Sequence, residues 1–174
     1  MTARHLTIAS ACLLMTTAMA ASQDAKPSDP QIAHIAYTAG QIDIEAGQLA
    51  LKKSKNKAVR SFAEDMVRDH TAVNDKALAL VKKLNVTPED NPTSKALQSQ
   101  ARKEQAALSK LSGKAFDAAY AKNEVAYHKT VNGALEKTLI PAASNDELKD
   151  LLSTGLKIFQ GHEEHAEHLA KEVK

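Results

Sequence analysis

The sequence is poor in cysteine and in aromatic residues. Its 174 residues include one cysteine, no tryptophan and 3% aromatic residues. The cysteine, Cys12, lies in a segment that we expect to be removed, so any metal site must use nitrogen and oxygen ligands. The 23 Lys and Arg residues nearly balance the 21 Asp and Glu residues. Because basic residues are not clustered and stacking rings are scarce, nucleic acid is a poor candidate partner.

Long apolar runs are also scarce, and the clearest one stands at the start of the chain. Residues 6–19 are mostly apolar, follow Arg4, and end at the small-x-small site Ala18-Met19-Ala20. This pattern is typical of a secretory signal peptide, and the run is too short to favour a transmembrane span in the mature chain. We therefore predict a signal peptide over 1–20, cleaved near Ala20, and a periplasmic or secreted protein. A short membrane anchor is the alternative.

The rest of the chain lacks strand-like alternation and predicts an all-α domain over 29–174, preceded by a flexible leader over 21–28. Apolar residues at helical spacing, together with capping and turn residues, predict helices over about 29–54, 57–84, 93–111, 114–139 and 146–173. Short connections make two antiparallel hairpins, and the helix 93–111 occupies the long connection between them. This is the topology of a ferritin-like four-helix bundle with an extra short helix in the crossover. An up-and-down bundle with that helix packed across one end is the alternative.

Histidines interrupt three of the apolar stripes. In the last helix His162 stands between Phe159 and Ala166 at helical spacing, and His70 and His128 hold similar positions in two others. A buried imidazole needs partners for its ring nitrogens. Helix rise places the three histidines and one acid from the first helix in the central third of the bundle. We therefore predict a metal site formed by Glu45, His70, His128 and His162, with Glu124 and His165 as possible additional ligands.

Three imidazoles and one carboxylate suit zinc first, and iron or copper next. The Glu-x-x-His pattern of carboxylate-bridged di-iron sites is absent, because Val67, Val125 and Phe159 stand three residues before the three histidines. One mononuclear ion is therefore the better hypothesis. The sequence shows neither a nucleophile motif nor a glycine-rich phosphate loop, which favours a protein that is not an enzyme.

A metal-free protein is the competing hypothesis. The internal histidines would then be satisfied by Glu45, Glu124, Tyr120 or water, and the domain would act as a structural or interaction protein of the cell envelope. The sequence leaves its oligomeric state and its partners open.

Three stretches carry a resemblance to a known family. The runs IEAGQLA (44–50), VRSFAEDMVRDH (59–70) and FDAAY (116–120), with His128 beyond, resemble the secreted bacterial proteins grouped as domain of unknown function 4142. The resemblance spans about residues 29–173 and implies a ferritin-type four-helix bundle of the cell envelope. The family's closing pattern, His-Leu-x-x-Ala-x-x-Leu, maps onto His162, but Glu163 replaces the leucine, so His165 also remains a candidate for this position. The resemblance supplies no activity.

Overall fold

The chain is helical throughout the part that the structure, a computed structural model, describes, which is residues 26–174. The predicted signal peptide and most of the predicted leader lie outside the described residues. The elements in order are α1 (Asp29–Lys53), α2 (Lys57–Lys83), α3 (Pro92–Ser109), α4 (Gly113–Ala134), the π-helical turn η1 (Leu135–Leu139), α5 (Ile140–Ala142) and α6 (Asp146–Glu172). Residues 26–174 contain no strand, which confirms the all-α prediction. None of these helices has a stretch long and apolar enough to cross a membrane.

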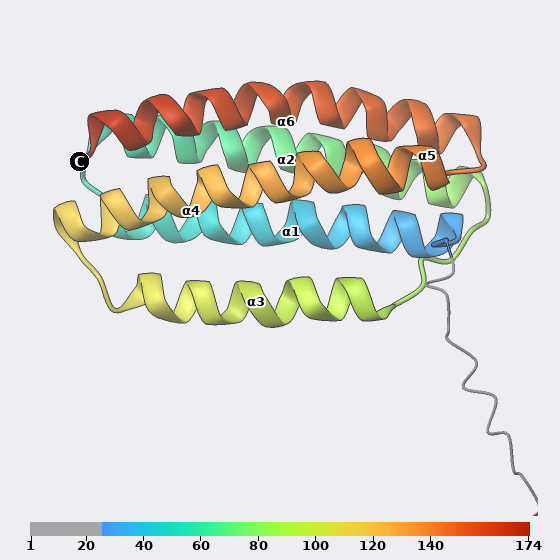
Figure 1. The fold of residues 1–174 in the computed structure, drawn as a ribbon, viewed down its shortest axis with the longest axis horizontal. Coiled ribbons are helices and arrows are strands. Elements are labelled where there is room, and N and C mark those ends of the chain that lie inside the picture. Colours follow the sequence, from blue (N-terminus) through green and yellow to red (C-terminus); the bar gives the residue numbers. More distant parts are fainter. Residues whose placement is uncertain (1–25) are drawn as a thin grey trace, which may run out of the picture.

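Two antiparallel helix pairs form the bundle, α1 with α2 and α4 with α6, and α3 lies outside them along α1 (Figure 1). Contacts at both ends of α3 show that it runs in the same direction as α1. The Asn91 side chain donates to the Gln31 carbonyl at 3.4 Å, and Lys53 Nζ donates to the Ser109 carbonyl at 2.6 Å. The crossover helix therefore spans the bundle's length, and the alternative of a short helix across one end was wrong.

Side chains at the helix starts satisfy backbone N–H groups that have no partner within the helix. Ser28 caps α1 through a capping box with Gln31, and Asn56 caps α2. The start of α3 is set by Asn91, slightly earlier than predicted from the sequence, because its side chain accepts from the Ser94 N–H. In α6 the cap is Asn145, whose side chain accepts from the Leu148 N–H at 3.0 Å.

The helical backbone of α4 continues beyond residue 139, the end predicted from the sequence, and passes Pro141. The helical backbone continues to Ala142 because the chain widens into a π-helical turn just before the proline. The Ile140 N–H bonds to the Leu135 carbonyl, five residues back instead of four. Proline in a regular α-helix clashes with the carbonyl four residues earlier. A wider turn gives that carbonyl another position, so the helix passes the proline.

Two apolar clusters form the core of the bundle, one toward each end. The cluster near the α1–α2 turn contains the large side chains of Phe62, Met66, Phe116 and Tyr120, each fully buried. The cluster at the other end includes Ile32, Ile35, Leu139, Leu148, Leu152 and Phe159. Buried polar side chains separate the two clusters at the level of His70 and His128. The two cores therefore hold the four long helices on both sides of a polar layer.

The close approach of α1 and α2 requires glycine at position 47. A Cβ atom there would lie 2.9 Å from Val67 Cγ2 and 3.1 Å from the Ala63 carbonyl oxygen of α2. We expect Gly47→Ala to lower the free energy of unfolding by about 1–3 kcal/mol, because the helices must move apart. Gly161→Ala is the matched control, since a Cβ at Gly161 meets no atom of the described chain within 4 Å.

The control variant should gain up to about 1 kcal/mol from the better helix propensity of alanine. Urea unfolding followed by circular dichroism measures both changes. Equal stability of the two variants would contradict the close approach.

Candidate metal centre

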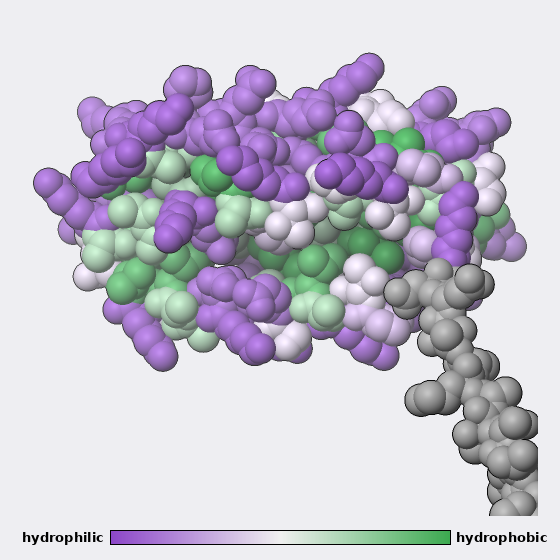
Figure 2. Space-filling view, in the orientation of Figure 1, coloured by the Kyte–Doolittle hydropathy of each residue, from purple (hydrophilic) through white to green (hydrophobic). Residues whose placement is uncertain are grey.

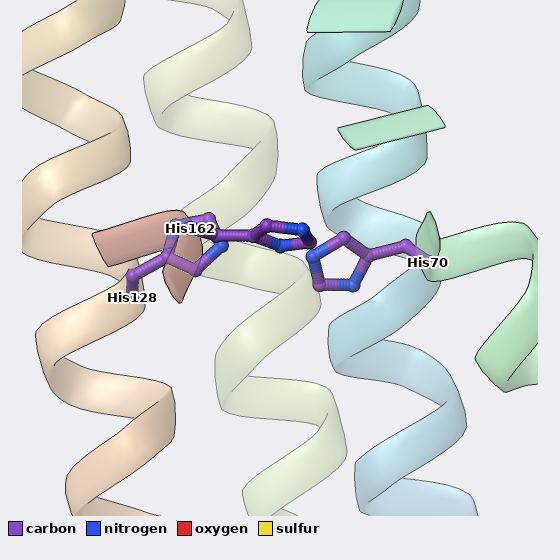
Figure 3. Close-up of side chains that lie close together, drawn as sticks. All are labelled: His70, His128 and His162. Atoms are coloured by element: carbon purple, nitrogen blue, oxygen red, sulfur yellow. The ribbon is translucent and has the colours of Figure 1, made fainter. Parts of the chain in front are cut away.

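Each of the four long bundle helices brings at least one ionisable side chain into the polar layer. Asp43 comes from α1, His70 from α2, His128 from α4 and His162 from α6. Their exposed fractions are 1%, 2%, 1% and 7%, so all four are removed from water. Figure 3 shows the three imidazole rings turned toward one another across the bundle.

The three histidines lie close enough to bind one ion. A ring nitrogen from each of His70, His128 and His162 lies within 4.8 Å of the others. Ligand atoms around a tetrahedral zinc ion are about 3.3 Å apart. Small side-chain rotations therefore suffice to bring all three nitrogens onto one ion.

Asp43 supplies negative charge to this group. Its Oδ2 atom lies 2.9 Å from His70 Nε2 and 3.2 Å from His128 Nε2. Burial alone would raise the pKa of Asp43, but the adjacent His70, with smaller effects from His128 and His162, outweighs it and lowers the pKa to about 2. Asp43 is therefore a carboxylate, the form that binds metal cations.

Hydrogen bonds to the outer ring nitrogens orient two of the histidines. His128 Nδ1 lies 3.0 Å from the backbone carbonyl of Glu124, which can only accept, so Nδ1 donates and Nε2 keeps its lone pair. His162 Nε2 donates to Asp69 Oδ2 at 3.0 Å, which leaves the lone pair on Nδ1. Metal-binding histidines are usually oriented in this way by an acceptor on the second nitrogen.

Burial keeps these imidazoles neutral at neutral pH. It lowers the pKa of His128 despite the adjacent Asp43, and it lowers the pKa of His162 to about 4. Burial, together with the nearby Asp43 charge, raises the pKa of Glu124 well above its usual value. The layer therefore holds one carboxylate, neutral imidazoles at His128 and His162, and a protonated Glu124.

Many polar atoms in this layer lack a hydrogen-bond partner within residues 26–174. They include both Asp43 oxygens, both His70 nitrogens, His128 Nε2, His162 Nδ1 and both Glu124 oxygens. The close contacts between Asp43 and the two histidines do not have hydrogen-bond geometry. Buried polar atoms are normally paired, and leaving them unpaired costs free energy. A cation fits this group, because most of these atoms are lone-pair donors that face one another.

The structure does not bring Glu45 to this layer. Glu45 is exposed and accepts a 3.2 Å hydrogen bond from Gln105 of α3. It lies two residues after Asp43, about 200° around the helix. The outer face of α1 is covered by α3, so apolar residues such as Ile44 also occur on that face. The apolar stripe of α1 was therefore ambiguous, and the sequence interpretation placed Glu45 in the layer, where the structure places Asp43.

The remaining candidates are divided between the layer and the surface. Glu124 forms a second close group with Asp43 and His128, whose ligand atoms lie within 4.8 Å of one another. His165 is exposed, and its ring packs edge-on against that of Phe62, with the ring centroids 5.1 Å apart. Sequence reasoning missed Asp43, although Ala39, Asp43, Ala46 and Ala50 share helical spacing on the inner face of α1. It also missed Asp69, for which the sequence carried no signal.

A family model described as "Domain of unknown function (DUF4142)" matches residues 14–169. The chain belongs to the DUF4142 family. This confirms the resemblance seen in the sequence, and the family description assigns no activity.

Among solved structures, this DUF4142 protein is similar to a crystallised DUF305 fragment from Deinococcus radiodurans. The two are 18% identical, with a TM-score of 0.66 over 84% of this chain and 99% of the fragment. At that identity the likeness shows the helical fold alone. A search of curated proteins found no significant match.

Proposed function

We propose that this DUF4142 protein binds one transition-metal ion through Asp43, His70, His128 and His162. The observation that carries the proposal is the convergence of these buried side chains from four helices, with ligand atoms that lack hydrogen-bond partners among the described residues. Three imidazoles and one carboxylate suit zinc first, and iron or copper next. Glu124 is an additional candidate ligand, because it lies beside Asp43 and His128.

Each residue has a distinct role in this proposal. Asp43 supplies the negative charge that a divalent cation requires in a buried site. His128 and His162 offer the nitrogens left free by their bonds to the Glu124 carbonyl and to Asp69. Binding of the ion also favours loss of the Glu124 proton, because a cation lowers the pKa of a neighbouring acid.

The cellular part of the proposal rests on the first residues of the chain. We propose that the protein is exported by a signal peptide cleaved near Ala20 and works in the periplasm or outside the cell as a ferritin-like bundle. There it would hold or buffer a metal, in metal handling or in the response to envelope stress, without catalysing a reaction. N-terminal sequencing of the exported protein should begin near Ala21.

One observation favours a metal-free alternative. Asp43 already lies 2.9 Å from His70 Nε2 and 3.2 Å from His128 Nε2, so a small rotation of the His70 ring would let its N–H donate to the carboxylate without a metal ion. The bundle would then be a structural or interaction protein of the envelope. Metal analysis separates this alternative from the first proposal.

The test is equilibrium dialysis of the purified protein against zinc, iron(II) and copper(II), followed by elemental analysis. We expect one ion per chain. His128→Gln should weaken binding by about a hundredfold or more, since loss of an outer-shell partner alone costs about tenfold to a hundredfold, whereas His168→Gln, at an exposed position of α6, should not. The metal proposal is wrong if the folded protein takes up none of the three ions.

A further inference from the structure

A cavity of about 910 Å³ lies on one side of the polar layer. Its inner end is formed by Asp43, His70 and His128, and it extends past Leu148 to Pro92 at the start of α3. From Asp43 to Gln31 along α1 this is about 18 Å by helix rise. Residues of both α3 and α4 line it, and Figure 2 shows hydrophobic side chains in the strip between these two helices.

Small residues create this space. Ala36, Ala39, Ala77 and Gly155 line the cavity from three helices. The opposite half of the bundle is filled by large, fully buried side chains, namely Phe62, Met66, Phe116 and Tyr120. One half of the bundle is thus densely packed, and the other half has room for a guest. A volume of this size falls within the usual range of small-molecule sites.

Charge is distributed unevenly along the cavity. Among its described lining residues, the charged side chains other than histidine are Asp43 at the inner end and the exposed Lys26 and Lys137 at the other end. An anionic group is repelled by Asp43 and attracted by the two lysines. Between these ends the walls are mainly aliphatic. The cavity therefore matches a long apolar molecule with one negative end at the surface.

We propose that this cavity binds an unbranched apolar chain with a single anionic end, such as a fatty acid. The tail lies along α1 toward Gly155, and the head group lies at the mouth beside Lys137. This binding does not depend on the metal site, because the head group stays away from the polar layer.

The first test is calorimetric titration of the purified protein with dodecanoate, both with a chelator and with zinc present. We expect binding in both conditions. Ala36→Phe should fill the cavity and weaken binding at least tenfold. Ala170→Phe is the matched control, because Ala170 is also partly buried but packs against the other apolar cluster. Ala77→Phe, from another wall of the cavity, repeats the test in case Ala36→Phe disturbs folding.

The second test changes an exposed lysine at the proposed position of the head group, where a substitution should not disturb folding. Lys137→Glu should weaken dodecanoate binding about threefold to tenfold and leave dodecanol binding unchanged. Lys122→Glu, exposed on α4 and outside the cavity lining, is the control.

Three results would overturn the proposal. They are no dodecanoate binding, unchanged binding after the cavity is filled, and an equal effect of Lys137→Glu on the acid and the alcohol. If dodecanoate binds but zinc does not, the metal proposal alone fails.

Discussion

Asp43→Asn is expected to weaken zinc binding by about a hundredfold or more, whereas Glu45→Gln should leave it within about twofold. Asp43 is buried and its Oδ2 atom contacts two of the proposed histidine ligands, at 2.9 and 3.2 Å. Asparagine preserves the shape but removes the charge, so the ion would enter a buried site that lacks the carboxylate already ionised before binding. Glu45 points to α3, where it bonds to Gln105.

Zinc competition against a fluorescent chelator measures both affinities, and circular dichroism checks that both variants remain helical. The comparison shows which of two acids, two residues apart on α1, contributes to zinc binding. A strong loss in Glu45→Gln with little change in Asp43→Asn would contradict the arrangement of the polar layer described above.

The helices could be read from the sequence because their signals are local. Apolar spacing identified the long helices, and α2 begins at residue 57, as predicted, where Asn56 caps it. The end of α4 was predicted too early, at residue 139, because a π-helical turn carries the helix past Pro141, and such a turn has no simple sequence signal.

The meeting of the three histidines was foreseeable for a similar reason. His70, His128 and His162 each stand on an apolar stripe, so burial followed from spacing, and helix rise placed them at one level. The structure brings them together. Their role as metal ligands remains a prediction.

The acid could not be identified in this way, because its assignment depends on where α3 lies. Most helices of a bundle have one buried face, but α1 is covered on its outer side as well, so Ile44 is as buried as residues on the inner side. Only the packing shows which side faces the other bundle helices. The cavity could not be predicted from the sequence for a related reason, since its volume depends on how closely whole helices approach one another.

The metal-free protein should be most stable near pH about 6.5 and lose stability in both directions. On the acid side, His162 has a pKa of about 4 when folded, below the ordinary value of 6.5. As the pH falls from 6.5 toward 4, His162 binds a proton in the unfolded chain but stays neutral in the folded chain. This contribution reaches about 3 kcal/mol, but the proton that folded Glu124 retains offsets much of it, so the net loss depends on His128, whose pKa is also lowered.

On the alkaline side the slope comes from Glu124, whose pKa burial raises well above its ordinary value. The folded protein keeps this proton while the unfolded chain has already released it, so stability falls as the pH rises, by up to about 1.4 kcal/mol per pH unit. Near pH about 6.5 the two unfolded histidines together hold about one proton, which balances the proton on Glu124. Asp43, with a pKa of about 2, adds no slope in this range.

Urea unfolding between pH 4.5 and 8.5 with a chelator present measures this profile. Glu124→Gln keeps a neutral side chain. It should remove the loss of stability at alkaline pH, because glutamine has no proton to release on unfolding. His162→Gln should reduce the acid decline. Glu164→Gln, exposed on α6, is the control and should leave the profile unchanged. Stability that rises steadily from pH 5 to 8 would mean that Glu124 ionises within the folded protein, and the metal-free layer would then hold two carboxylates instead of one.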